Sequence, residues 1–250
     1  MPHPPLQKRP LRTLERVISK AGLGSRTEAR KWIGAGRVAV NGKVVGTPDQ
    51  WVDMERDRVT LDGRPVRPSK RIYLLVYKPK GYLTTYKDPE GRPTVYDLIS
   101  EVEEWVFPVG RLDLDTSGLL LMTNDAQFAE RITNPSHKVP KSYLVKAATY
   151  LTDEQLAQLR AGIVLSDGPT KPAEVERLRE AGGKTVFEIV ITEGRNRQVR
   201  RMVEALGSKA LKLVRTGIGP LRIGDLQIGK HRRLTPAEVK SLGAQARSDE

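Results

Sequence analysis

Hydrophobic residues in the first sixty positions change their spacing twice. Between residues 14 and 21 they recur at helical spacing, and the glycines at positions 22 and 24 end that helix. Ser25 and Glu28 have the spacing of a capping box, which predicts a second short helix. Valines then alternate on both sides of Asn41-Gly42, a pair that favours a type I′ hairpin turn. The pattern predicts a small domain of two helices and a hairpin over residues 11–57.

A second, larger set of hydrophobic runs starts at residue 72. Strands are predicted at 72–77, 119–122, 141–145 and 184–192, and helices at 96–99, 126–132 and 152–159. These elements predict a second domain over residues 71–243. Residues 58–70 contain Gly63, Pro65 and Pro68 and are predicted to be a linker. Residues 1–10 and 244–250 are predicted to be disordered.

Composition excludes several classes of protein. The chain has 250 residues, of which 38% are hydrophobic, and no run of apolar residues is long enough to cross a membrane. The first ten residues lack the apolar core of a signal peptide. There is no cysteine, and therefore neither a disulfide framework nor a thiolate nucleophile. We expect a protein of the cytoplasm, without membrane contact.

The net charge of +13 is distributed unevenly along the chain. Residues 1–70 carry 15 Lys and Arg against 7 Asp and Glu, whereas the remaining residues carry 28 against 23. A folded domain with such an excess favours a polyanionic partner, and no strongly amphipathic helix points to a membrane. We therefore expect RNA or DNA as the partner. A basic surface kept only for solubility is the alternative.

The stretch from Val109 to Asp125 carries the best candidate chemistry. Leu119 to Met122 predicts a strand that is buried on both faces, and Gly118 allows a tight turn directly before it. Asp113 is then placed on a short loop between two core strands, where a rigid scaffold can hold a reactive group. The alternative that Asp113 and Asp115 are ordinary turn residues stays open.

Three other sites with this residue pattern fit the sequence poorly. A calcium loop needs a bidentate Glu at its twelfth position, where this chain has Asn124. An aspartic protease needs a second Asp-containing copy, which the chain lacks. A magnesium-dependent phosphatase needs further acidic ligands, which the basic remainder does not obviously supply.

A cluster of arginines follows Glu193. The apolar positions after it fall on one helical face, at Val199, Met202, Val203 and Leu206. Arg197 and Arg201 are expected opposite this face, whereas Arg200 lies at its edge. An arginine at that edge can reach a half-buried carboxylate and keep it ionised. The alternative is that these arginines are solvated or bind phosphate.

Two of these stretches together resemble a known family. GRLDLDTSGLLLMTND, at residues 110–125, and EGRNRQVRRM, at residues 193–202, resemble the motifs of the RsuA/RluB family of ribosomal RNA pseudouridine synthases. The resemblance implies that Asp113 is the catalytic carboxylate. It also implies that Tyr143, in Lys141-Ser142-Tyr143, stacks on the target base and that Arg200 is the basic partner of the catalytic Asp.

The N-terminal pattern has a resemblance of its own. LGSRTEARKWIGAGRVAVNGKVV, at residues 23–45, resembles the S-four RNA-binding module, in which the second helix and the residues before it line an RNA groove. The expected RNA contacts, mostly to phosphate, are Ser25, Arg26, Arg30, Lys31 and Arg37. In the second domain the expected RNA-binding residues are Arg111, Lys141, Arg195, Arg197 and Arg201.

The family also implies a fold and a reaction. The fold is α+β, with the small N-terminal module followed by a mixed, mainly antiparallel sheet flanked by helices. Pseudouridine formation breaks the bond between ribose and the ring nitrogen and rejoins the ring through carbon 5, and it needs no cofactor, metal or nucleotide. The target uridine must leave its helix first, and Arg111 is expected to fill the space that it vacates. Asp113 attacks either the ring or the ribose, or it helps to form a glycal-like intermediate.

The expected partner is ribosomal RNA, and the expected state is a monomer. The residues 88–98 and 193–202 look closer to enzymes of the large ribosomal subunit than to those of the small subunit. Two alternatives stay open, namely a small-subunit pseudouridine synthase and a non-catalytic RNA-binding factor for ribosome assembly.

Overall fold

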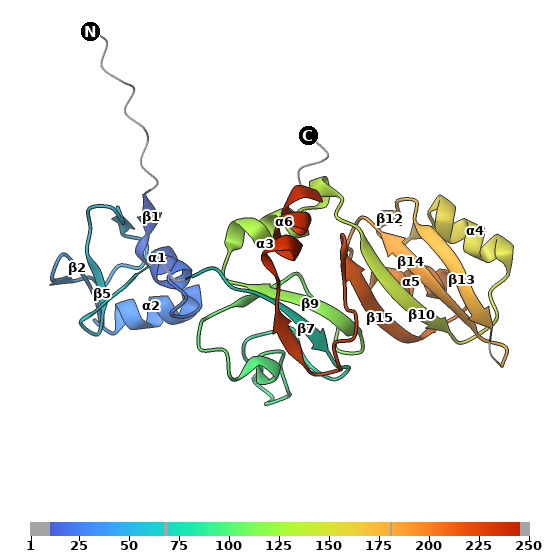
Figure 1. Cartoon of the computed structure of the whole chain (residues 1–250), viewed down its shortest axis with the longest axis horizontal. Coiled ribbons are helices and arrows are strands. Elements are labelled where there is room, and N and C mark those ends of the chain that lie inside the picture. Colours follow the sequence, from blue (N-terminus) through green and yellow to red (C-terminus); the bar gives the residue numbers. More distant parts are fainter. Residues whose placement is uncertain (1–10, 68–69, 181, 246–250) are drawn as a thin grey trace, which may run out of the picture. The chain divides into compact units, whose positions relative to one another are not determined.

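The computed structural model describes residues 11–67, 70–180 and 182–245 (Figure 1). The chain forms two compact units, one ending at Arg71 and including Val102–Val106, and one made of Ile72–Glu101 and the chain from Phe107 onward. The second unit begins at Ile72, whereas the second domain was predicted from residue 71. The predicted disorder at 1–10 and 246–250 lies outside the described residues, and residues 244 and 245 belong to a helix.

The first unit contains the two predicted helices and short strands around them. Its elements are β1 (Arg12–Thr13), α1 (Leu14–Lys20), α2 (Arg26–Gly34), β2 (Val38–Val40), β3 (Lys43–Val44), β4 (Trp51–Val52), β5 (Val59–Leu61) and β6 (Arg64–Pro65). The Ser25 and Glu28 capping box is present at the start of α2. Asn41 and Gly42 have φ of 53° and 80°, as a type I′ turn requires, so the predicted hairpin is confirmed.

Most of the predicted linker is part of this unit. Strands β5 and β6 extend the hairpin into a four-stranded sheet in the order β3-β2-β5-β6, so the prediction of a linker over 58–70 was wrong. Asp62 and Gly63 have φ of 50° and 76° and form the turn between them. Pro65 is tolerated because β6 is an edge strand that pairs only with β5 among the described strands. Val66 is buried in the core of the unit.

The second unit is built on one sheet of nine strands. The main order is β13-β14-β10-β15-β9-β7-β17, with β8 paired to β9 and β16 paired to β15. The strands are β7 (Tyr73–Lys78), β8 (Phe107–Val109), β9 (Ser117–Thr123), β10 (Lys141–Ala147), β13 (Glu174–Glu180), β14 (Thr185–Ile191), β15 (Ala210–Ile218), β16 (Leu221–Arg222) and β17 (His231–Arg233). All pairs are antiparallel except β15 with β9. The predicted α+β fold with a mixed, mainly antiparallel sheet is confirmed.

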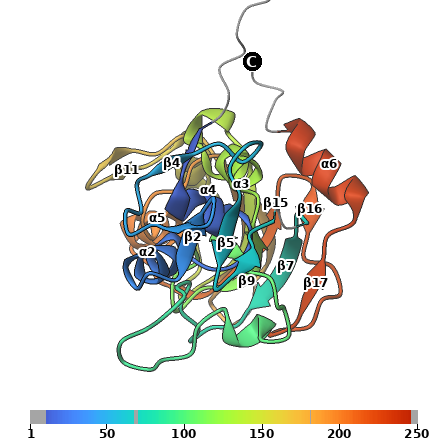
Figure 2. The ribbon, with the colours of Figure 1, turned by 90° about the vertical axis from the view of Figure 1, so that its left-hand side faces the viewer.

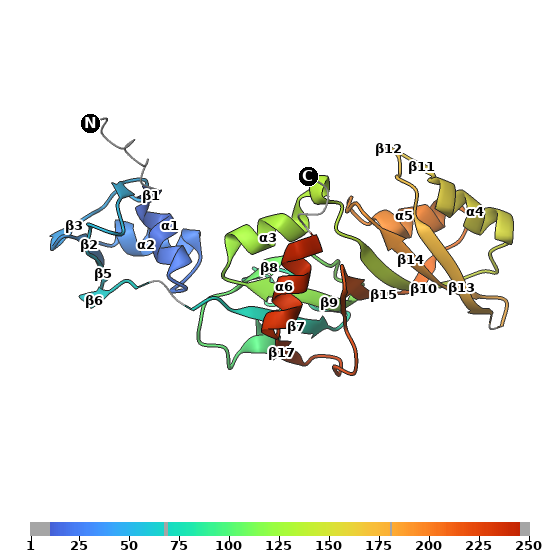
Figure 3. The same cartoon turned by 45° about the horizontal axis from the view of Figure 1, so that its top comes forward.

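Two pairs of helices cover different parts of this sheet. Helices α3 (Ala126–Thr133) and α6 (Pro236–Gln245) share a hydrophobic core with β7 and β9, and they lie side by side (Figures 1 and 3). Helices α4 (Asp153–Ala161) and α5 (Gln198–Ala205) share another core with β10, β13, β14 and β15. Figure 2 shows α6, β16 and β17, all from the C-terminal part, on one side of this unit. Short 3₁₀ turns at Asp97–Ile99 and Pro135–His137 and a small hairpin of β11 (Val164–Leu165) and β12 (Gly168–Pro169) complete it.

The parallel contact between β9 and β15 is unusually close. Gly118, with φ of 119°, pairs with Arg215, and a Cβ on Gly118 would lie 2.3 Å from the Arg215 carbonyl oxygen and 2.4 Å from its nitrogen. Only glycine fits there without moving a strand. This junction brings two distant parts of the chain to the same point of the sheet.

Within the described residues, no helix is long and apolar enough to cross a membrane.

Candidate active site

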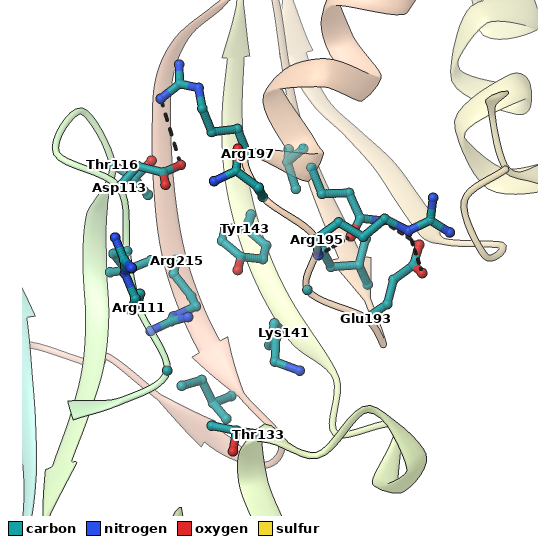
Figure 4. Close-up of a pocket in the computed structure, with 18 of the residues that line it drawn as sticks. Arg111, Asp113, Thr116, Thr133, Lys141, Tyr143, Glu193, Arg195, Arg197 and Arg215 are labelled. Atoms are coloured by element: carbon teal, nitrogen blue, oxygen red, sulfur yellow. Dashed lines mark hydrogen bonds and ion pairs between the residues drawn. The ribbon is translucent and has the colours of Figure 1, made fainter. Parts of the chain in front are cut away.

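A cavity of about 390 Å³ opens between the β8–β9 loop, strands β10 and β15, and the loop before α5 (Figure 4). The loop from β8 to β9 contributes Arg111, Asp113 and Thr116 to its lining, and β10 contributes Lys141 and Tyr143. Arg215 comes from β15, and Glu193 to Val199 form another wall. The cavity therefore brings together most of the predicted site residues of the second domain.

The loop that carries Asp113 is fixed from behind by Lys78. Its side chain is fully buried, and its ammonium donates to the carbonyl oxygens of Asp113 at 2.9 Å and Thr116 at 2.8 Å. Burial lowers the pKa of Lys78 to about 8, with a smaller opposing effect of the nearby carboxylates. Sequence reasoning missed this role, because lysine side chains are rarely fully buried.

Two further contacts from the same segment hold the loop. The backbone N–H of Gly81 donates to the Leu114 carbonyl at 2.7 Å, and the Thr84 hydroxyl donates to the Leu112 carbonyl at 2.8 Å. Residues 78–84 thus anchor the loop on both sides of Asp113. Its carboxylate is left facing the cavity, with one third of the side chain exposed.

The basic neighbours of Asp113 differ from the predicted ones. Arg197 lies closest to it, with Nη1 3.9 Å from Asp113 Oδ2. Arg200 instead pairs with Asp115 at 3.3 Å and donates to the Asp115 carbonyl at 2.8 Å. The ion pair predicted between Arg200 and Asp113 is therefore made with Asp115, two residues further along the loop. Arg200 acts on the loop that carries Asp113.

Arg197 reaches the loop because it precedes helix α5. It has φ of 48°, a left-handed conformation, and α5 begins only at Gln198. The prediction that Arg197 lies on the outer face of the helix was wrong for this reason. Its guanidinium donates to both carboxylate oxygens of Asp115, at 3.0 and 3.2 Å. Although partial burial opposes this effect, Arg197 and Arg200 lower the pKa of Asp115.

Tyr143 and Arg215 are direct partners on adjacent strands and line the same cavity. Arg215 is 4% exposed, and its Nε donates to the Leu119 carbonyl at 2.7 Å. Lys141 lies two residues before Tyr143 and donates to the Val139 carbonyl at 3.0 Å. Burial, together with the charge of Arg215, lowers the pKa of Lys141 to about 8. Arg215 was not among the predicted site residues, since no local pattern marks a buried arginine on a strand.

Arg195 and Arg201 have partners within the unit. Both pair with Asp167, and Arg195 also donates to the Gly168 carbonyl at 3.0 Å. These contacts tie the segment around the start of α5 to the β11–β12 hairpin. RNA binding by Arg195 and Arg201 stays a prediction, and their carboxylate partner shows that they also support the cavity wall.

Some of the residues predicted to contact RNA form hydrogen bonds or ion pairs within the first unit. The Ser25 hydroxyl accepts from the Glu28 N–H in the capping box at 3.1 Å. Arg30 pairs with Glu15 and Asp49, and Arg37 pairs with Asp62 at 2.6 Å. Arg26 and Lys31 are exposed and have no ion pair among the described residues.

Comparison with known proteins identifies both units. Residues 72–205 match the family described as RNA pseudouridylate synthase, and residues 12–57 match the S4 domain. The chain is 42% identical over 230 residues to an uncharacterized RNA pseudouridine synthase of Aquifex aeolicus, covering 92% of each chain. It is 40% identical over 235 residues to the ribosomal large subunit pseudouridine synthase B of Bacillus subtilis, covering 93% of this chain and 96% of that one.

A solved structure supports the same conclusion. A crystal structure of a pseudouridylate synthase is 32% identical to this chain, has a TM-score of 0.66 and is matched over 92% of this chain and 99% of the other. The predicted resemblance is therefore confirmed for both domains. The chain belongs to the RNA pseudouridine synthase family and is an RNA-binding enzyme of that class, with an S4 domain at its N-terminal end.

Proposed function

We propose that this enzyme converts a specific uridine of large-subunit ribosomal RNA to pseudouridine. The name of the Bacillus subtilis relative, which matches over almost the whole chain, supports this choice of RNA. A relative from Pseudomonas aeruginosa that carries the same name is 36% identical over 250 residues. The S4 domain supplies a second RNA-binding surface in addition to that of the catalytic unit.

The observation that carries the proposal is the position of Asp113. Its carboxylate faces a cavity whose wall includes the ring of Tyr143, while Lys78 holds its backbone from behind. A uridine stacked in an RNA helix cannot present its glycosidic bond to a carboxylate, so the nucleotide enters the cavity flipped out of its helix. Tyr143 then provides the aromatic face on which the uracil ring stacks.

The arginines around Asp113 hold its loop in place. Arg197 Nη1 lies 3.9 Å from Asp113 Oδ2, the carboxylate that is proposed to attack the nucleotide. Arg200 and Arg197 fix the loop through Asp115, so the Asp113 carboxylate is positioned before the substrate arrives. Asp113 then acts on the uracil ring or on the ribose to release and rejoin the base.

Arg111 is proposed to replace the flipped uridine in the RNA helix. It lies on the loop beside Asp113, is exposed and lines the same cavity. Arg111→Ala should reduce turnover on structured RNA more than on a single-stranded substrate. Equal turnover by the variant and the unchanged enzyme on both substrates would contradict this role.

The function is tested with Asp113→Asn and large-subunit ribosomal RNA tritiated at uracil carbon 5. The reaction exchanges the C5 proton, so tritium release measures turnover. The variant should bind RNA and fold like the unchanged protein but release no tritium. Asp125→Asn, outside the cavity, is the control and should retain turnover. Undiminished turnover by Asp113→Asn would refute the assigned role.

The same assay separates the alternative functions. Modification of small-subunit RNA alone would assign the enzyme to the other ribosomal subunit. Binding without turnover on either RNA would favour a non-catalytic assembly factor. Mapping pseudouridines in ribosomal RNA from cells with and without this gene then identifies the target nucleotide.

A further inference from the structure

Arg215 lines the cavity, but it has no role in the reaction as proposed above. Arg215 is 4% exposed, and its Nη2 is buried without a hydrogen-bond partner among the residues that the structure describes. Among the described residues it forms no ion pair, and its bond to Leu119 uses only Nε. A buried guanidinium N–H without a partner is costly, so its retention points to a ligand that supplies the acceptor.

Lys141 is a second cation that lines the same cavity. Figure 4 shows Arg215 and Lys141 below Tyr143 in the cavity. Neither cation has a carboxylate partner in the described part of the chain, and their charges repel each other. Asp113, by contrast, already has Arg197 as its basic neighbour. Two adjacent, unneutralised cations in a half-enclosed cavity are arranged to stabilise an anion.

The position of Arg215 relative to Tyr143 indicates which anion this is. The two residues are cross-strand partners on β10 and β15, and both line the cavity. Side chains of directly opposite residues lie on the same face of a sheet, about 5 Å apart at Cβ. A base stacked on Tyr143 therefore presents its edge to Arg215. The uracil edge offers two carbonyl oxygens, which match a group that can only donate.

We propose that Arg215, supported by Lys141, stabilises the uracil anion while the base is detached from the ribose, by donating to a carbonyl oxygen of the ring. This inference rests on the function proposed above. An RNA phosphate is the other anion available, but it would have to enter a part of the cavity where Arg215 is almost completely enclosed.

The step can be written for attack of Asp113 on the ribose. The carboxylate forms a bond to C1′ as the N1–C1′ bond breaks, and the electron pair of that bond stays on the uracil. Its negative charge spreads over N1, O2 and O4. Carbon 5 then attacks C1′, the carboxylate leaves with its electrons, C5 loses its proton and N1 gains one. Arg215 is needed between the two steps, when the charge on O2 and O4 is largest.

The test compares Arg215→Met with Arg160→Met in single-turnover reactions on ribosomal RNA. Arg160 is a matched control because its Nε also donates to a backbone carbonyl, that of Val175 at 2.9 Å, and it does not line the cavity. Arg215→Met should lower the rate constant about a hundredfold, the typical effect of removing one donor to a developing anion. Arg215→Met should change the affinity for RNA less than about threefold. The control Arg160→Met should change neither the rate constant nor the affinity.

Leaving-group dependence distinguishes this role from a structural one. Fluorine at carbon 5 makes the uracil anion less basic, so RNA with 5-fluorouridine at the target position needs less stabilisation. The loss of rate caused by Arg215→Met, measured as disappearance of the target nucleoside, should shrink from about a hundredfold to about tenfold. An equal loss with both nucleosides, or a loss of RNA affinity without a loss of rate, would overturn the proposal.

Two more variants keep the test decisive if Arg215→Met does not fold. Arg215→Lys keeps a cation, and Lys141→Met removes the weaker contributor, so each should show an intermediate loss that also shrinks with 5-fluorouridine. Unchanged rates in both would overturn the proposal. If the unchanged enzyme modifies no ribosomal RNA, the proposed function itself is refuted, and the role of Arg215 is refuted with it.

Discussion

Substituting Gly118 by alanine should force strands β9 and β15 apart. The new Cβ would lie 2.3 Å from the Arg215 carbonyl oxygen, whereas ordinary contacts of a Cβ begin at 3.4 Å. The two backbones would have to separate by about 1 Å, and close-packed interiors resist such shifts. Since the neighbours of Gly118 are backbone atoms, no side chain can rotate to make room.

The cost has two parts that a control can separate. Alanine at a φ of 119° adds backbone strain of about 1–3 kcal/mol. Overpacking against Arg215 adds about 1–3 kcal/mol more. Gly168 has a similar φ of 104°, but a Cβ there would meet nothing within 4 Å. Gly168→Ala should therefore show only the first part.

Urea denaturation of both variants measures the difference. Gly118→Ala should lower the free energy of unfolding by about 2 kcal/mol more than Gly168→Ala does, with the same dependence on urea concentration. It should also lower turnover, because Asp113 and Arg215 lie on opposite sides of the displaced junction. Equal stability of the two variants would refute the view that β9 and β15 cannot separate.

Three further predictions concern charged groups. Because the pKa of Lys141 is lowered to about 8, turnover should fall above pH 8 as the ammonium loses its proton. Lys141→Arg should move this fall to higher pH. Coinciding pH profiles of the two enzymes would contradict this role of Lys141. Arg232 lowers the pKa of Glu238 from 4.5 to about 2, so this pair contributes stability above pH 4.5 that is lost as the pH falls toward 2. Glu238→Gln should thus cost about 1 kcal/mol at pH 7, after solvent screening, and little at pH 2; thermal unfolding at both pH values measures this. Replacing Arg26 and Lys31 together by alanine should weaken RNA binding and reduce the slope of its salt dependence by about 2, and an unchanged slope would exclude phosphate contacts by both.

Local signals in the sequence predicted local structure well. The capping box at Ser25 and the turn at Asn41-Gly42 are present, because each depends only on neighbouring residues. A further capping box, which was not among the predictions, lies at the start of α6. Thr235 and Glu238 form the reciprocal bonds of a capping box at the start of α6, with distances of 2.8 and 3.2 Å.

The missed strands β5 and β6 show how one residue can mislead. Asp62-Gly63 is a turn signal of the same kind as Asn41-Gly42, but Pro65 favoured a linker over a strand. Proline is compatible with an edge strand, and the position of a strand within a sheet depends on distant partners. Its pairing with β2 could not be derived from residues 58–70 alone.

The site was predicted in its members but not in all of its contacts. Asp113, Tyr143 and Lys141 line the cavity as expected, whereas the partner of Arg200 is Asp115. Arg197 reaches the loop because of its left-handed backbone, which a helical projection does not contain. Lys78 and Arg215 escaped prediction because burial of a cation is decided by tertiary packing.

The junction of β9 with β15 has a consequence for biosynthesis. Arg215 bonds to Leu119, 96 residues earlier in the chain, and β15 lies between β10 and β9 in the sheet. During translation the segment with Asp113 leaves the ribosome long before β15 exists, and contacts of such long sequence range form late. A nascent chain that stops before residue 210 lacks one wall of the cavity, so we expect the enzyme to act on RNA only after β15 has been made.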